Sequence, residues 1–330
     1  MPSWTPELPS PEDLPGAEIV AASTIIVPNS LNPSQPAIEE EIGTVTRPLI
    51  FQMGRRLARN TPAMIGLGLV LLVALIAILA PLIGRYDPNK VPNIISITQL
   101  NQSPSGAHWF GTDYLGRDLW ARVIFGARVS LPVGIGIVLI SFALGTPMGI
   151  IAGFGGRLLD DLIARFLDIM LALPGILLAI VLVAFLGPGL RSVVIAVGIA
   201  GIPGYARIAR GSTLAVKHSD YVAASRAHGA GPIHIMFRHV FPNIVDPIVI
   251  LATLNLSGGI LAAAALSFIG LGTQIPSSDW GTLLSNGFQH MFQSAAEIYF
   301  PGLAIMITVL GINLLGDGLG DALNPRLHGR

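Results

Sequence analysis

Long uncharged runs of apolar residues dominate the pattern of hydrophobic and polar positions along the chain. A helix needs about 20 mainly apolar residues to cross the hydrocarbon core of a membrane. Five uncharged runs are close to that length or exceed it: Met64–Ile83, Val129–Phe154, Ile169–Leu190, Pro247–Thr273 and Ile298–Gly316. A sixth run, Ser192–Ala206, is shorter and continues as far as Arg210. The pattern predicts an all-α integral membrane protein with about six transmembrane helices.

Small residues and prolines interrupt these runs. Gly, Ala and Ser recur in them, and such residues let helices pack closely in lipid. Pro147, Pro174 and Pro203 lie within the runs, and proline kinks or breaks a helix because it lacks an N–H group. We therefore expect close-packed, kinked spans.

The composition supports lipid as the solvent of this chain. Apolar types make up 52% of the 330 residues and charged types only 12%, whereas soluble domains carry about 25% charge. With the N-terminus inside, the inner segments hold thirteen Lys and Arg residues and the outer segments six. This bias predicts a multi-pass protein of the cell (inner) membrane with both termini cytoplasmic. Trp109, Trp120 and Trp280 fall in outer segments near span ends, where aromatic belts form.

The chain divides into four predicted regions. Residues 1–46 are rich in proline and acidic residues and contain no Lys or Arg, which indicates a disordered cytoplasmic tail rather than a signal peptide. Residues 47–90 form an N-terminal module with the first span, and residues 91–127 an extracytoplasmic segment. Residues 128–330 hold the core, with five spans and a long inner connection at about 215–240.

The inner connection has the signals of two short helices. Ser219 or Asp220 is suited to begin the first helix, and Gly229 to end it in a left-handed cap. Pro232 is suited to the first turn of the second. Two interpretations remain open for this surface: a docking site for another protein, or an amphipathic interfacial helix.

The same connection resembles the coupling loop of ABC-importer permeases of the dipeptide/oligopeptide (and nickel) transport family. That family's loop reads Tyr-Val-x-Ala-x-Arg-Ala-x-Gly with Arg-His-x-x-Pro-Asn downstream. The matching residues are Tyr221-Val222, Ala224, Arg226-Ala227, Gly229, Arg238-His239 and Pro242-Asn243. The resemblance implies an ATPase-coupling loop that contains Asp220, Tyr221, Ala223, Ala224, Ser225, Arg226, Gly229, Arg238 and Pro242. Ala223 and Ser225 depart from the general Glu-Ala-Ala pattern of ABC-importer permeases.

Further stretches are similar to the same family, over about residues 50–330. They are His108–Asp113 with Gly116–Asp118, Ala265–Gly272 with Asp279–Gly281, and Asp317–Arg326. Residues 55–89 resemble the extra N-terminal module of one of the two permeases in such importers.

The resemblance implies a pathway-forming subunit that works by alternating access. Its partners would be a second permease subunit, two ABC ATPases and an extracytoplasmic substrate-binding protein. Peptides would be the cargo, with nickel chelates, glutathione or another small solute as alternatives. The only lysines, Lys90 and Lys217, are not followed by Ser or Thr, so no phosphate-binding loop is expected. ATP and Mg²⁺ would be bound by the partner ATPases, and this chain would be neither an enzyme nor a cofactor protein.

Two other classes of function fit the sequence less well. An ion-coupled secondary transporter needs acidic residues deep in its spans, and the span interiors have none. A non-transporting membrane scaffold would explain the docking loop but not the other matching stretches.

Several polar residues admit more than one role. His108, Asp113 and Asp118 lack metal-ligand spacing, and backbone capping in Gly-containing turns is expected instead. Asp161 and Arg165 lie four residues apart, a spacing at which they could pair on one helix face. The charges at the entry to the third span could also anchor it at the inner interface, lie near the coupling loop or relay protons.

The spans and the inner connection hold further polar side chains. Asn255 and Asn313 would bond between helices or contact a permeating substrate. His234 and His239 are five residues apart, so we expect them on different faces of a helix and assign them no metal.

Overall fold

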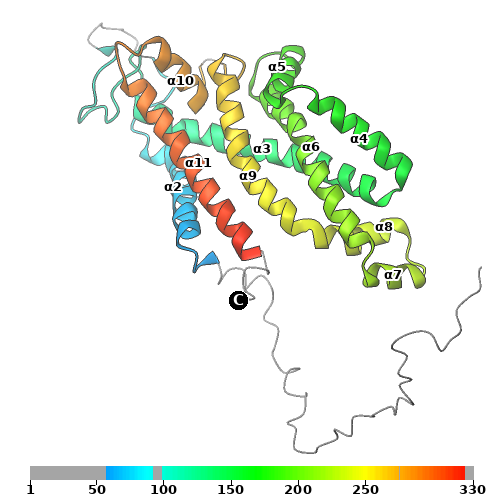
Figure 1. The fold of residues 1–330 in the computed structure, drawn as a ribbon. Helices are drawn as coiled ribbons and strands as arrows, with labels where there is room; N and C mark the ends of the chain where they lie inside the picture. Colours follow the sequence, from blue (N-terminus) through cyan, green and yellow to red (C-terminus); the bar gives the residue numbers. More distant parts are fainter. Residues whose placement is uncertain (1–56, 92–98, 275, 324–330) are drawn as a thin grey trace, which may run out of the picture. The chain divides into compact units, whose positions relative to one another are not determined.

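The computed structural model describes residues 57–91, 99–274 and 276–323, all within one compact unit, Leu49–Arg330 (Figure 1). The predicted tail, residues 1–46, and the end of the last family-like stretch, residues 324–326, lie outside the described residues. The described elements are α2 (Thr61–Ile83), α3 (Leu119–Phe154), α4 (Arg157–Leu171), α5 (Gly175–Leu186), α6 (Leu190–Lys217), α7 (Asp220–Ala227), α8 (Pro232–Ile235), the π-helix η3 (Met236–Val240), α9 (Phe241–Phe268), α10 (Trp280–Gln289) and α11 (Ala296–Leu323).

The helices confirm the predicted all-α membrane fold. Among the described residues, five helical stretches are long and apolar enough to cross a membrane: α2, α3, α6, α11 and the run from α8 to α9. A sixth crossing is present if α4 and α5 form one broken span. In the part of the chain that the structure describes, β-structure is limited to one isolated bridge between Thr112 and Asp118.

The third span is broken near Pro174, where the sequence predicts a kink or a break. The predicted run Ile169–Leu190 is divided between α4 and α5, which meet at an angle of 86°. Pro174 occupies the N-cap of α5, and a residue before proline is disfavoured in the helical conformation, so α4 ends at Leu171. The twelve residues of α5 reach only about 18 Å, less than the ~30 Å hydrocarbon core.

A seam of glycines joins α3 to α6. Gly145, Gly149 and Gly153 recur every four residues on the face of α3 that meets α6. A Cβ atom on Gly145 would lie 2.6 Å from the Ile202 carbonyl oxygen, and one on Gly153 would lie 2.8 Å from Thr213 Cβ. The two backbones therefore approach as closely as small-residue seams allow in membranes.

Trp280 does not belong to an aromatic belt, contrary to the sequence prediction. Its side chain is only 1% exposed, and its indole N–H donates to the Val123 carbonyl at 2.9 Å. Gly126 on α3 leaves the space that the indole fills. Trp109 is half exposed and packs edge-on against Trp120. Trp280 thus holds α10 against α3 instead of facing lipid.

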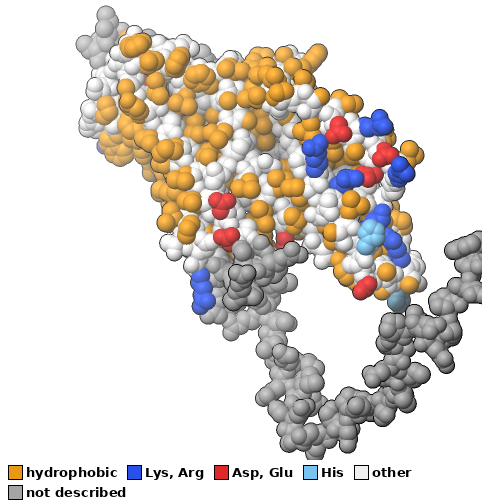
Figure 2. All heavy atoms as spheres, in the orientation of Figure 1, with side chains coloured by type: hydrophobic (Ala, Val, Ile, Leu, Met, Phe, Trp, Pro, Cys, Tyr) orange, Lys and Arg blue, Asp and Glu red, His pale blue; other side chains and the backbone are white. Residues whose placement is uncertain are grey.

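The outer surface separates apolar from charged regions. Figure 2 shows apolar side chains over α2, α5, α9 and α11, with charged side chains gathered over α4, the end of α6 and α7. Leu82, Ile78 and Leu71 on α2 are among the large apolar side chains that are exposed. Exposed apolar residues over long helices are the surface that a protein presents to lipid.

Candidate functional site

The connection from α6 to α9 (residues 218–240) contains the two short helices that the sequence predicts. α7 covers Asp220–Ala227, and α8 begins at Pro232 in the N1 position. Ser219 occupies the N-cap of α7, but its hydroxyl donates back to the Val216 carbonyl at 2.7 Å instead of accepting from α7. The expected side-chain cap is therefore absent from this helix start.

The C-terminus of α7 has a complete Schellman motif. Gly229 adopts φ +82°, its N–H donates to the Arg226 carbonyl at 2.9 Å, and the Ala230 N–H donates to the Ser225 carbonyl at 3.1 Å. These two bonds satisfy carbonyls that the helix end leaves free. Glycine suits position 229 because residues with a Cβ atom are strained at such a φ.

One buried residue anchors α7. Val222 is the only fully buried side chain of this helix, and it packs in a cluster with Ile150 of α3, Tyr205 of α6 and Ile248 of α9. The side chains of α7 that face outward include those of Tyr221, Ala223, Ala224, Arg226 and Ala227. The helix thus presents three alanines beside Tyr221 and Arg226, while its one buried side chain belongs to a cluster that it shares with α3, α6 and α9.

Phe154, at the end of α3, provides a second anchor. The Lys217 Nζ donates to the carbonyls of Gly153 and Phe154 at 3.2 Å each. Lys217 Nζ lies 5.7 Å from the centroid of the Phe154 ring, and Arg226 Cζ lies 5.2 Å from it. Cations near the last carbonyls also stabilise a helix C-terminus. Lys217 thus joins the end of α6 to the end of α3, and Arg226 joins α7 to the Phe154 ring.

His234 and His239 lie against each other, contrary to the sequence prediction. Their ring centroids are 6.1 Å apart in an edge-on arrangement, and Tyr221 lies 6.2 Å from His239. The reason is the π-helix η3, whose i→i+5 bonds bring residues five apart onto one face. The spacing rule of an α-helix does not hold in this turn.

Two ion pairs join α4 to α6. Arg210 donates two hydrogen bonds to the carboxylate of Asp160, and Arg207 donates one to Asp168 at 3.0 Å. The pair of Asp161 with Arg165 that the spacing allows is not formed, because Asp161 lies 3.9 Å from Arg157 instead. The acidic face of α4 is turned toward the basic residues of α6.

A polar network packs the connection between α2 and α3. Asp113 accepts hydrogen bonds from the Leu115 and Arg117 backbone N–H groups and from Arg117 Nε. Asp118 caps α3 by accepting from the Ala121 N–H at 2.7 Å, and its other oxygen lies 2.8 Å from His108 Nδ1. The expected capping roles of both aspartates are therefore present.

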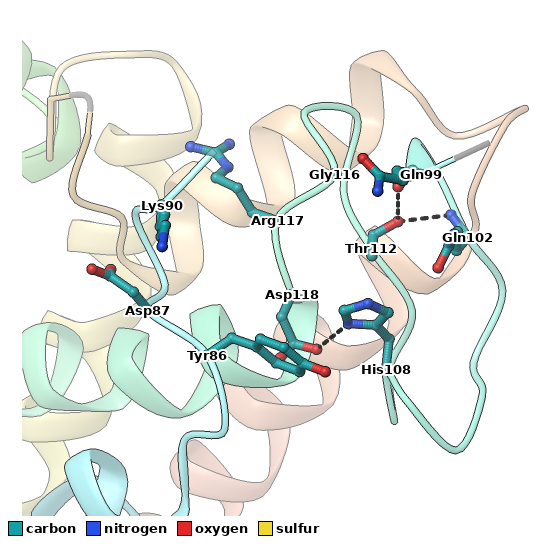
Figure 3. A pocket seen from close by; sticks show the side chains of 10 residues that line it. All are labelled: Tyr86, Asp87, Lys90, Gln99, Gln102, His108, Thr112, Gly116, Arg117 and Asp118. Carbon is teal, nitrogen blue, oxygen red and sulfur yellow. Dashed lines mark hydrogen bonds and ion pairs between the residues drawn. The ribbon is translucent and has the colours of Figure 1, made fainter. Parts of the chain in front are cut away.

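A polar pocket of about 330 Å³ opens beside this network. Figure 3 shows His108 and Asp118 facing each other near Tyr86, while Thr112 bridges Gln99 and Gln102. The buried Glu297 of α11 interacts electrostatically with Arg122 and Asp113. The sequence prediction missed Glu297, although it is an acidic residue directly before an apolar run.

A second cavity, of about 200 Å³, lies among α3, α5, α6 and α9. Asn255 and Ser141 are its polar lining residues, beside several glycines and alanines. The Ser141 hydroxyl donates to the carbonyls of Ile137 and Gly198. Asn313 instead accepts a hydrogen bond from Ser257 at 2.6 Å, which joins α11 to α9. Asn313 is thus used between helices, whereas Asn255 lines the cavity and also interacts with the Tyr205 side chain of α6.

Comparisons with known proteins identify the family to which this chain belongs. Residues 145–329 match the family described as binding-protein-dependent transport system inner membrane component. The chain belongs to that family. Residues 50–104 of the permease also match the N-terminal transmembrane domain of oligopeptide transport permease C, so the expected family and the expected extra N-terminal module are confirmed.

Relatives of the permease match over most of its length. It is 42% identical over 275 residues to a dipeptide transport system permease protein DppC from Alkalihalophilus pseudofirmus, covering 83% of this chain and 88% of that protein. It is 44% identical over 272 residues to a di/tripeptide transport system permease protein DppC from Pseudomonas aeruginosa, covering 82% and 90%. It is 43% identical over 273 residues to a glutathione transport system permease protein GsiD from Pectobacterium atrosepticum, covering 83% and 89%.

Among solved structures, the permease resembles a chain of the inward-facing MetNI methionine ABC transporter. The TM-score is 0.52 at 20% identity, and the match covers 62% of this chain and 98% of that chain. At this identity the likeness shows the fold, which is that of an ABC-importer permease.

The structure gathers most of the residues that the sequence assigns to coupling. Those from Asp220 to Gly229 lie on α7 and its cap, whereas Arg238 lies in η3 and Pro242 in the first turn of α9. The sequence prediction missed the anchors Val222, Phe154 and Lys217. Val222 could have been found as an apolar residue isolated in a polar connection. Phe154 and Lys217 could not, because their roles depend on contacts between distant segments.

Proposed function

We propose that this permease forms one half of the pathway of an ABC importer of peptides. It would pair with a second permease, with two ATPases on the cytoplasmic side and a substrate-binding protein on the other. The observation that carries this proposal is α7: an exposed helix of small residues, closed by Gly229 and anchored through Val222 and Phe154. Such a helix can fit a groove on an ATPase, and its anchors can transmit the movement of the ATPase to the transmembrane helices.

The anchors define a route from α7 to the spans. Val222 belongs to a core cluster with residues of α3, α6 and α9, and these helices, together with α5, surround the cavity that Asn255 lines. ATP-driven closure of the two ATPases would move α7, rock these helices and open the cavity alternately to each side. ATP and Mg²⁺ would remain on the ATPases, so the permease supplies the pathway and the coupling contact.

The proposed topology places α7 in the cytoplasm, with both termini on that side. Residues 1–46 would be an acidic cytoplasmic tail, 47–90 the N-terminal module and 91–127 the extracytoplasmic segment. Residues 128–330 would be the permease core. A reporter fused after Gly156 should then show a cytoplasmic signal, and a reporter fused after Gly189 an outside signal.

Peptides are the proposed cargo because two of the relatives are named as dipeptide or di/tripeptide permeases. Glutathione is the second candidate, since other relatives of similar identity are named for it. Nickel chelates are a third alternative within the same importer type. Uptake of labelled dipeptide, glutathione and nickel by cells that express the whole importer distinguishes these cargoes.

The coupling role is tested with a bulky residue on α7. Ala224→Trp should abolish ATPase docking and ATP-dependent uptake. The proposed groove on the ATPase would fit the small side chains of α7 and would have no room for an indole. Leu82→Trp, at a highly exposed position on α2, is the matched control and should transport normally. Normal docking and uptake with Ala224→Trp would overturn the coupling assignment.

A further inference from the structure

An apolar crevice of about 390 Å³ lies between α3 and the α8–η3 turn. Ala143, Pro147 and Ile151 line it from α3, and Ile233 and Phe237 from the other side. This volume is within the range of about 300–1,000 Å³ that is typical of small-molecule sites. The crevice is separate from the cavity near Asn255 and from the exposed face of α7.

The crevice has one polar group that lacks a partner. Thr146 lines it, is only 1% exposed, and its hydroxyl forms no hydrogen bond among the described residues. Buried polar groups are normally hydrogen-bonded, because an unpaired one costs free energy. A ligand with a carbonyl acceptor would satisfy this hydroxyl.

Water is a poor occupant of this space. A buried water needs two to four polar partners, and the lining offers the Thr146 hydroxyl among otherwise apolar side chains. Phe237 is 73% exposed, and Ile233 and Ile151 are also exposed, so the crevice is open at its mouth. Its apolar lining continues onto the exposed apolar surface of α3 at Leu139 and Leu144, which the membrane covers in a spanning protein.

The turn that forms one wall carries one positive charge, that of Arg238, beside His234 and His239. The nearest acidic residue that follows in sequence is Asp246 of α9. Basic pockets beside the cytoplasmic ends of membrane helices bind anionic head groups, since the cytoplasmic leaflet carries anionic lipids. This step rests on the proposed topology, which places the turn on the cytoplasmic side.

We propose that this crevice binds one acyl chain of an anionic membrane phospholipid. The hydrocarbon fills the space beside Pro147 and Phe237, and the Thr146 hydroxyl donates to the ester carbonyl at the head of the chain. The phosphate lies toward the basic α8–η3 turn. The bound lipid holds this turn, and through it the base of α9, against α3.

Lipid retention on the detergent-purified importer complex tests the site without any transport assay. Native mass spectrometry should detect one phospholipid on this subunit, and phosphatidylglycerol should be retained at least fivefold better than phosphatidylcholine. Ala143→Trp fills the crevice and should lower retention at least tenfold. Leu71→Trp, on the exposed apolar surface of α2 and outside the lining of the crevice, is the matched control and should leave retention within twofold.

Three results would overturn the site: no lipid on the unmodified subunit, equal retention by both head groups, or equal retention in both tryptophan variants. High-yield cross-linking of Phe237→Cys to the second permease would also overturn it, because a protein would then occupy the crevice. If Ala143→Trp fails to assemble, Thr146→Val gives the test, with a three- to tenfold loss expected. Since no step uses ATP, a failure of the coupling role leaves this result unaffected.

Discussion

Arg210 on α6 holds the carboxylate of Asp160 on α4 through two hydrogen bonds, one of them 2.7 Å long. The two residues are 50 positions apart in sequence. Two parallel N–H···O bonds fit the planar guanidinium to a carboxylate and fix their orientation. This contact holds the short amphipathic helix α4 against α6, although α4 is bent away from α5.

Replacing Asp160 by Asn should weaken this attachment. We expect a double-mutant cycle with Arg210→Gln to give a coupling energy of about 1 kcal/mol, because the pair is bidentate yet partly exposed to solvent. Thermal unfolding of the purified complex measures it. Asp161→Asn is the control, since Asp161 lies 3.9 Å from an exposed Arg157, and it should change the melting temperature little. Equal effects of Asp160→Asn and Asp161→Asn would contradict the assignment.

The glycine seam between α3 and α6 should tolerate no added methyl group at its centre. A Cβ atom on Gly149 would overlap the Ala206 carbonyl oxygen and lie 2.7 Å from Ala209 Cβ. Gly149→Ala should therefore destabilise the permease by about 1–3 kcal/mol through overpacking, seen as a lower melting temperature. Gly204→Ala on α6, where nothing lies within 4 Å, should be neutral. A neutral Gly149→Ala would show that the two backbones are further apart.

The Schellman cap of α7 makes a separate prediction. Gly229→Ala places a side chain at φ +82°, which costs an L-residue about 1–2 kcal/mol although no atom obstructs the space. Hydrogen exchange of the α7 amides should accelerate by about tenfold. Gly231→Ala is the matched control, because Gly231 has φ −71° and equally open space. The idea fails if both variants exchange at the same rate as the unmodified permease.

The buried ionic network between α2 and α3 should depend strongly on Asp113. Its carboxylate lies 2.7 Å from Arg117 Nε and 3.5 Å from Arg122 Nε, and all three side chains are buried. Asp113→Asn removes the carboxylate that pairs with both buried arginines and leaves Glu297 as their acidic neighbour, and we expect a loss of about 3–5 kcal/mol. The yield and melting temperature of the assembled complex report it. Asp87→Asn, at an exposed position of the same connection, should retain normal yield, and an equal loss there would refute the argument.

Much of the fold follows from local sequence. Five predicted spans match long helices in position, because the cost of placing charges in hydrocarbon acts on each segment by itself. The third differs because Pro174 allows either a kink or a full break, and the packing of α4 on α6 decides between them. The same local rules placed α7 and α8, since Gly229 and Pro232 restrict their own backbone angles.

The site was less predictable than the helices that carry it. The coupling residues of α7 were predicted from the resemblance to a family's coupling loop, but Val222 and Phe154 became anchors only through contacts with distant segments. His234 and His239 meet because a π turn replaces an α turn. No local rule specifies that turn, because its i→i+5 geometry is stable only in a particular packing environment.

The sequence by itself determined that the chain is a membrane protein of about six apolar helices. It also determined that a connection with two short helices precedes the predicted span Pro247–Thr273. Hydrophobicity, proline and glycine act over a few residues, so a linear pattern records them. Only the tertiary structure decided that Arg210 holds Asp160, that Trp280 is buried against α3 and that α4 and α5 meet at 86°. Those outcomes depend on distances between residues far apart in the chain, which folding alone brings together.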